Sequence, residues 1–135
     1  MLLSGGLDSV VLMARELADG RTVWPVHVRV GLAWEDAEAA ALARIVTRPE
    51  LAGRLQPLTT LHFDMRYLYT GAHWAVAGRA RGWTEPDESV YLEGRNITLL
   101  SKAAIFCASV GIPRLVLGPL AGNPFPDATP AFFDA

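Results

Sequence analysis

Short apolar runs rich in valine and leucine alternate along the chain with longer stretches in which apolar residues recur every three or four positions. The short runs predict strands, and the longer stretches predict amphipathic helices. The predicted strands are 2–3, 22–30, 58–63 and 115–117. The predicted helices are one after Asp8 that ends at Asp19-Gly20, one from Trp34 to Pro49, and one from Gly94 to about Val110.

Each predicted helix carries an apolar stripe that would face a core. The stripes are Val10, Met13, Ala14 and Leu17, then Trp34, Ala37, Ala41 and Ile45, then Leu99 or Leu100, Ala103, Cys107 and Val110. Asp8 or Ser9 is placed to cap the first helix, and acidic residues at 35, 36 and 38 suit the positive end of the second. Residues 64–93 show no period, and so long an irregular stretch is often functional.

The predicted order is strand, helix, strand, helix, strand, long loop, helix, strand. Such alternation indicates an α/β fold in which a parallel sheet carries helices on both faces. Ligands of open parallel sheets bind beyond the carboxyl ends of the strands, at the point where the strand order reverses. The glycine-rich segment after the first strand lies at this place, so it is the first candidate site.

Composition narrows the class of protein. A length of 135 residues fits a single domain, 1–135, and half of the residues are apolar, as in globular proteins. A net charge of −2 with no basic half argues against a direct nucleic-acid surface. No apolar stretch approaches the roughly 20 residues that span a bilayer, and nothing resembles a signal peptide. We therefore expect a cytoplasmic protein that does not contact membranes.

The single cysteine, Cys107, cannot form an intrachain disulfide or a cysteine-cluster zinc site. It lies on an apolar stripe and is predicted to be buried and structural. The three histidines show no metal-ligand spacing, and His27 and His62 within predicted strands are expected to be packing or edge residues. We expect no zinc site.

The opening string Ser4-Gly5-Gly6-Leu7-Asp8-Ser9 joins a strand to a helix. Gly5 and Gly6 allow positive φ and a close approach of the backbone to a ligand, so that successive N–H groups form an anion nest at the start of the helix. The two serines add hydroxyl donors, and a pyrophosphate fits this arrangement. Asp8 would repel phosphate, so it is expected to hold Mg²⁺ or to cap the helix.

Two other phosphate loops are disfavoured. A Walker-A loop has a longer spacer and ends in Gly-Lys-Ser/Thr, but the first lysine of this chain is Lys102. The Gly-x-Gly-x-x-Gly pattern is also missing. The string instead resembles the PP-loop of the N-type ATP pyrophosphatases. The resemblance implies an adenine-nucleotide alpha-hydrolase-like fold, ATP cleavage between the α and β phosphates, and adenylation of a substrate.

A second block extends the resemblance. Gly94-Arg95-Asn96-Ile97, an alanine-rich helix, Gly118, and Phe-Pro-Asp-Ala-Thr-Pro-Ala-Phe at 125–132 follow the layout of the 7-cyano-7-deazaguanine synthase family, which also has a segment similar to 24–31. The resemblance implies conversion of a 7-carboxy-7-deazaguanine to its nitrile with ATP and ammonia, on the route to queuosine. It also implies a homodimer and, in the family, a structural zinc on four cysteines.

On this layout, the residues expected to contact nucleotide or acceptor are Ser4, Gly5, Gly6, Leu7, Asp8, Ser9, Val28, Gly94, Arg95, Asn96, Gly118 and Asp127. The catalytic candidates are Asp8, which would hold Mg²⁺, Arg95, which would bind an anion bidentately, and Lys102, which would neutralise developing charge. Asn96 is expected to act mainly as a capping or turn residue, and Asp127 to hold Mg²⁺ or substrate.

The chain departs from the family in three ways. Ala128-Thr129 stands where the family usually has Cys-Arg, the sequence stops at Ala135 before the zinc-bearing cysteines, and it begins almost on the glycine loop. Two alternatives therefore stay open beside the synthase. One is a related PP-loop ligase that acts on another carboxylate. The other is a non-catalytic nucleotide-binding module.

Two further groups of residues are weaker candidates for a functional role. Acidic residues at 87, 88 and 93 are expected to form a solvated loop rather than a metal site. Trp74 and Trp83 are expected to serve a core, with stacking on a base as the alternative.

Overall fold

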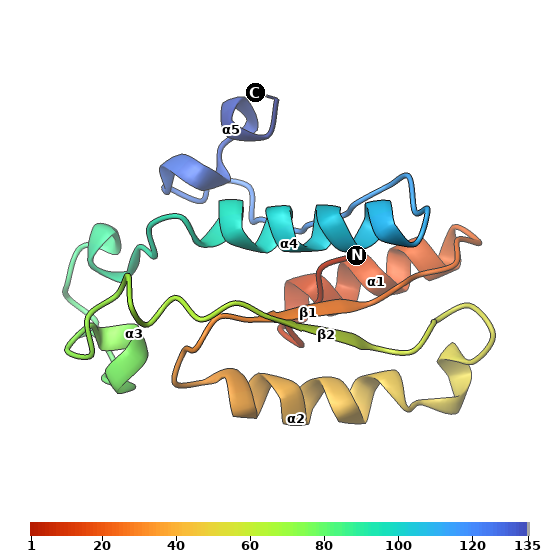
Figure 1. Ribbon diagram of the computed structural model, residues 1–135, viewed down its shortest axis with the longest axis horizontal. Helices are drawn as coiled ribbons and strands as arrows, with labels where there is room; N and C mark the ends of the chain where they lie inside the picture. The colour runs from red at the N-terminus through yellow and green to blue at the C-terminus, as the bar shows by residue number, and fades with distance from the viewer. Residues whose placement is uncertain (135) are drawn as a thin grey trace.

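The computed structural model describes residues 1–134 (Figure 1). Its regular elements are α1 Leu7–Ala18, β1 Val26–Arg29, α2 Glu35–Val46, β2 Thr59–His62, α3 Trp74–Ala77, α4 Arg95–Ser109 and α5 Pro130–Asp134. Short 3₁₀ turns lie at η1 Pro49–Leu51, η2 Asp87–Val90 and η3 Pro126–Ala128. All three predicted long helices are present, and each begins within a few residues of its predicted start.

The two strands pair in parallel, with Val26 opposite Thr59. The amino-terminal segment continues this arrangement on the other side of β1, where Leu2 and Val26 form a parallel bridge. The backbone N–H of Leu2 in turn donates to the carbonyl of Val116 at 2.9 Å. Four segments thus lie in the order 115–117, 1–3, β1, β2, and the pairings of 1–3 with β1 and of β1 with β2 are parallel.

The strand predicted at 22–30 is too long, because β1 spans only Val26–Arg29. The segment 115–117, also predicted as a strand, is not a regular strand in the structure. Pro25 has no backbone N–H to donate to a ladder, and β1 begins directly after it. Within residues 1–134, one bridge and two backbone hydrogen bonds join segment 1–3 to β1, whereas one backbone hydrogen bond joins it to segment 115–117.

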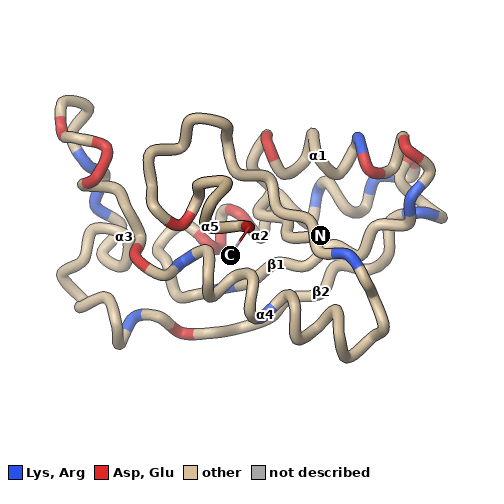
Figure 2. The backbone as a smooth tube through the Cα atoms, turned by 90° about the horizontal axis from the view of Figure 1, so that it is seen from above, with Lys and Arg blue, Asp and Glu red and all other residues tan. Residues whose placement is uncertain are grey.

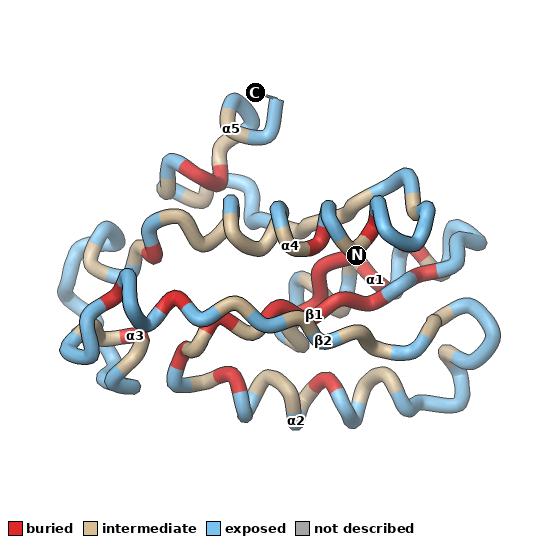
Figure 3. Tube along the Cα trace, in the orientation of Figure 1, coloured by how far each residue is buried: buried red, intermediate tan, exposed pale blue. Residues whose placement is uncertain are grey.

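Helices cover both faces of the strands, as predicted. Val26, Val28 and Leu2 point into one apolar cluster, which includes Ala103 of α4 and side chains packed around it. Leu3 points into a second cluster, together with buried residues of α1 and α2. Figure 1 shows α2 and α4 on opposite sides of the strands, and Figure 3 shows the deepest burial along the amino-terminal segment and β1.

The buried faces of the helices differ from the predicted stripes in detail. Ala14 and Ala37 are exposed, whereas Glu16 and Leu42 are buried. Alanine marks a buried face poorly because it is common on exposed helix surfaces as well. Cys107 is buried and has no disulfide partner, as predicted.

The irregular stretch after β2 is anchored by four buried residues, Met65, Tyr69, Ala75 and Leu92. Trp74 stacks on Trp34 with ring centroids 5.5 Å apart, so it serves packing. Trp83, in contrast, is fully exposed. Within residues 1–134, every helix is too short or too polar to cross a bilayer.

Candidate functional site

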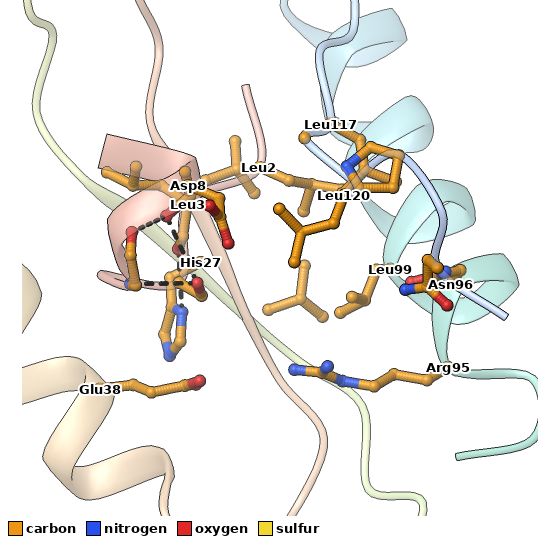
Figure 4. Close-up of a pocket in the computed structure, with 18 residues that line it drawn as sticks. Leu2, Leu3, Asp8, His27, Glu38, Arg95, Asn96, Leu99, Leu117 and Leu120 are labelled. Carbon is orange, nitrogen blue, oxygen red and sulfur yellow. Dashed lines mark hydrogen bonds between the residues drawn. The ribbon is translucent and has the colours of Figure 1, made fainter. Parts of the chain in front are cut away.

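A cavity of about 280 Å³ opens at the carboxyl ends of the parallel segments (Figure 4). Its walls come from the glycine loop, the amino-terminal segment, β1, α2, the start of α4 and the segment after Val116. The predicted site residues that line it are Ser4, Gly6, Asp8, Ser9, Val28, Arg95, Asn96 and Gly118. Segments more than 110 residues apart in sequence therefore meet at the place expected for ligands of a parallel sheet.

The two serines hold the glycine loop in shape. The Ser9 hydroxyl donates to the carbonyl of Gly6 at 2.9 Å, and the N–H of Gly6 donates to the Ser4 hydroxyl at 3.3 Å. The two hydroxyl oxygens lie 3.4 Å apart. The loop is thus preformed without a ligand, with polar groups of both serines at the cavity wall.

Different constraints favour glycine at positions 5 and 6 of the loop. Gly5 has φ of +85°, and a Cβ there would meet Leu42 Cγ at 3.2 Å and the carbonyl of Glu38 at 3.3 Å. The fold itself therefore requires glycine at this position.

Gly6 has φ of −70°, which corrects the expectation of positive φ for both glycines. It is also the N-cap of α1, so the predicted caps Asp8 and Ser9 lie inside the first turn. A Cβ on Gly6 would meet only Ser4 Oγ, at 3.4 Å. Because Gly6 lines the cavity, a side chain here would fill ligand space rather than disturb packing.

The start of α4 is positioned by Asp127. Its carboxylate accepts from the backbone N–H of Asn96 at 3.2 Å, and its carbonyl accepts from the Asn96 side-chain amide at 2.9 Å. Gly94, with φ of +71°, is the N-cap. Asp127 is buried and does not line the cavity, so its carboxylate caps the helix that carries Arg95.

Other predicted residues lie outside the cavity wall. The ammonium of Lys102 lies 4.6 Å above the centroid of the Phe63 ring, away from the glycine loop. Gly5, Leu7 and Gly94 shape the loop and the start of α4 but do not line the cavity. Gly118 does line it, and a Cβ there would come within 3.0 Å of Leu12 Cδ2.

The structure adds two titratable cavity residues that are not among the predicted site residues, His27 and Glu38. His27 is only 3% exposed, and its Nδ1 lies 3.2 Å from the carbonyl of Leu3. Because a carbonyl only accepts, Nδ1 carries the proton and Nε2 is the free acceptor. Burial lowers the pKa of His27, which favours this neutral form. The alternation of side chains along a strand could have indicated that His27 points inward. It could not have indicated that a cavity lies beside this side chain.

Glu38 lies on α2 with its carboxylate toward the cavity (Figure 4). Burial raises its pKa, and the charge of Arg95 acts in the opposite direction. In the sequence, Glu38 is recognisable only as a favourable charge near the start of α2. No local pattern marks it as a cavity residue, because the cavity is formed by segments far away in sequence.

Asp8 lies within the Ser4–Ser9 string of the glycine loop, and it lines the cavity. Magnesium in nucleotide sites is held through one or two carboxylates together with phosphate oxygens and water. Asp8 with the Ser4 and Ser9 hydroxyls fits that donor set. Among residues 1–134, no three His, Cys, Asp or Glu side chains form a cluster that could hold a metal by themselves.

A parallel strand pair covered by helices, with a Ser-Gly-Gly loop at its carboxyl end, places the chain in the PP-loop class of α/β proteins. A protein-family model described as "Queuosine biosynthesis protein QueC" matches residues 1–135, and the chain belongs to that family.

Curated relatives agree with this family. A "7-cyano-7-deazaguanine synthase" of Methanospirillum hungatei is 33% identical over 144 residues, covering 99% of this chain and 62% of the relative. A protein of the same name from Desulfotalea psychrophila is 26% identical over 145 residues, covering 100% and 62%. The "7-cyano-7-deazaguanine synthase 1" of Desulfitobacterium hafniense is 26% identical over 138 residues, covering 100% and 60%. The chain thus spans about three-fifths of the length of these relatives. No solved structure gives a significant match.

Proposed function

We propose that this chain belongs to an ATP-dependent enzyme that adenylates a carboxylate and amidates it on the way to a nitrile, as in 7-cyano-7-deazaguanine synthesis. The observation that carries the proposal is the convergence of the Ser4–Ser9 loop with Arg95 and Asn96 on one cavity. A pyrophosphate cradle and a guanidinium on the opposite wall suit a reaction between a triphosphate and a carboxylate.

The proposed chemistry proceeds by nucleophilic attack on the α-phosphorus of ATP. A carboxylate oxygen of the acceptor forms a bond to this phosphorus, the bond to the β-phosphate oxygen breaks, and pyrophosphate leaves. Ammonia then attacks the acyl carbon, AMP leaves with the electron pair, and a proton is lost to give the amide. In a second activation, the amide oxygen would form a bond to the α-phosphorus of another ATP and pyrophosphate would leave. The carbon–oxygen bond would then break, AMP would carry the oxygen away, and the nitrogen would lose two protons to give the nitrile.

The chain's own residues would act by binding and by stabilising charge. The Ser4–Ser9 loop would hold the leaving pyrophosphate through backbone N–H groups and hydroxyls. Arg95 would hold an anionic oxygen of the nucleotide or of the acceptor. Asp8 would hold Mg²⁺, which supplies charge neutralisation at the phosphates. Lys102 lies outside the cavity wall and has no part in this scheme.

Pyrophosphate release tests the proposal. The protein is incubated with ATP, Mg²⁺ and ammonium, with and without 7-carboxy-7-deazaguanine, and pyrophosphate and AMP are both measured. Release that depends on this acceptor is expected. Release with other carboxylates but not this one would favour a related PP-loop ligase. Binding of ATP without release under any condition would favour a non-catalytic nucleotide-binding module.

A further inference from the structure

One wall of the cavity presents two hydrogen-bond acceptors. The Nε2 atom of His27 is buried and has no partner, while Nδ1 is engaged by Leu3. The Glu38 carboxylate lies on the same side (Figure 4). A buried polar atom without a partner is costly, and a ligand that donates to Nε2 would remove this cost.

The facing wall presents a donor. Figure 4 shows the guanidinium of Arg95 and the carboxylate of Glu38 pointing toward one another across the cavity. Among the ion pairs within 4.0 Å that residues 1–134 form, neither side chain takes part. The Nε of Arg95 is also buried without a partner. Opposite charges that face each other without contact leave room for a ligand group between them.

A ligand group that fits between Glu38 and Arg95 needs N–H or O–H donors on one edge and an anionic or carbonyl oxygen on the adjoining edge. In a 7-carboxy-7-deazaguanine, the ring N–H and the exocyclic amine form the donor edge, and the ring carbonyl and carboxylate lie together on the adjoining edge. We infer that His27 and Glu38 bind the N–H edge of the acceptor heterocycle while Arg95 binds its oxygen edge. This inference rests on the proposed function and assigns Glu38 as the residue that selects a 2-amino heterocycle.

The phosphates of ATP do not fit the Glu38 side because the carboxylate would repel them. Ribose hydroxyls could also supply donors, so the test must separate the two sources. The main variant is Glu38→Gln, which keeps the size of the side chain but turns an amide N–H toward the donor edge. His27→Asn is the second, because its amide can still donate to Leu3 while the Nε2 acceptor is lost. Glu50→Gln, at an exposed position in η1, is the matched control.

Binding is measured by calorimetry in the presence of α,β-methylene-ATP. The titrants are 7-carboxy-7-deazaguanine and its analogue without the 2-amino group. The parent and Glu50→Gln should prefer the 2-amino compound by at least about tenfold, the effect of losing a hydrogen bond to a charged acceptor. In Glu38→Gln and His27→Asn this preference should fall or vanish, with the affinity for α,β-methylene-ATP unchanged.

Three results would overturn the inference. If the parent binds the acceptor and the variants keep the full preference, Glu38 does not read the donor edge. If Glu38→Gln instead weakens the binding of α,β-methylene-ATP, and less so its 2′-deoxy form, the ribose is the ligand of this wall. If the parent fails to bind the acceptor while it still binds the nucleotide, the proposed function itself is wrong, and the inference falls with it.

Discussion

The two ends of the parallel segments use the same residue types in opposite ways. At the amino end, the buried carboxylate of Glu16 accepts from Arg114 Nη2 at 3.0 Å and from Arg21 Nη1 at 3.1 Å. Figure 2 shows acidic and basic residues gathered at this end of α1. At the carboxyl end, Glu38 and Arg95 face each other across the cavity without forming an ion pair.

The pKa directions show what this difference means. Hydrogen bonding to Arg114 lowers the pKa of Glu16, whereas burial raises the pKa of Glu38. A charge that is satisfied by its neighbours supports the fold, while a desolvated and unpaired charge costs stability that a bound ligand can offset. Removal of a charged group should therefore affect stability at one end and binding at the other.

The largest expected effect is on ligand binding at the carboxyl end. Arg95→Ala should weaken binding of the acceptor or of ATP by roughly ten- to hundredfold, corresponding to the loss of a charge-assisted hydrogen bond of about 1.5–3 kcal/mol. Arg95→Lys should lose somewhat less binding affinity, because it keeps the charge but not the planar guanidinium fork. Calorimetric titration of both ligands measures this, and a melting curve checks that the fold is intact. Parent-like binding and turnover in both variants would show that Arg95 is a surface residue.

The next effect concerns the glycine loop. Gly6→Val should fold normally, since a Cβ meets only Ser4 Oγ, and should weaken binding of an ATP analogue at least tenfold, about 1.4 kcal/mol. Gly5→Val is the contrasting variant and should lower the melting temperature, because it combines φ of +85° with a collision at Leu42. Unchanged ATP affinity in a folded Gly6→Val protein would contradict the phosphate cradle.

The third prediction compares stability against pH for the two glutamates. The folded-state pKa of Glu16 is lowered, so its stabilisation is present above the ordinary glutamate pKa and is lost as pH falls through the folded value. The folded-state pKa of Glu38 is raised, so ionisation above it costs stability. At neutral pH, Glu16→Gln should unfold at lower denaturant and Glu38→Gln at the same or higher denaturant. If the denaturant midpoint shifts in the same direction in both variants, the proposed contrast between the two ends is wrong.

The smallest effect is expected at Lys102. Lys102→Met removes the charge over the Phe63 ring, an interaction worth about 0.5–1 kcal/mol at exposed sites. Turnover should stay within about twofold of the parent once folding is accounted for, because such a change corresponds to less than about 0.5 kcal/mol. A large loss of turnover at unchanged stability would return Lys102 to the catalytic candidates.

Much of the layout was predictable because it depends on local patterns. The helical period of apolar residues located α1, α2 and α4, and the runs at 22–30 and 58–63 located β1 and β2. The prediction of a strand at 115–117 was wrong, because this segment has only one backbone hydrogen bond to segment 1–3 within residues 1–134, and such distant pairing is not visible in a local window of sequence.

By itself, the sequence determined the glycine loop, the family and the start of α4, since each rests on a contiguous string with a specific backbone geometry. Only the tertiary structure decided which side chains share the cavity. It joined Glu38 and His27 to the glycine loop, excluded Lys102, and turned Asp127 into the cap that positions Arg95. The reason is physical: the burial and partners of a charge depend on segments far away in the chain, and periodicity carries no information about them.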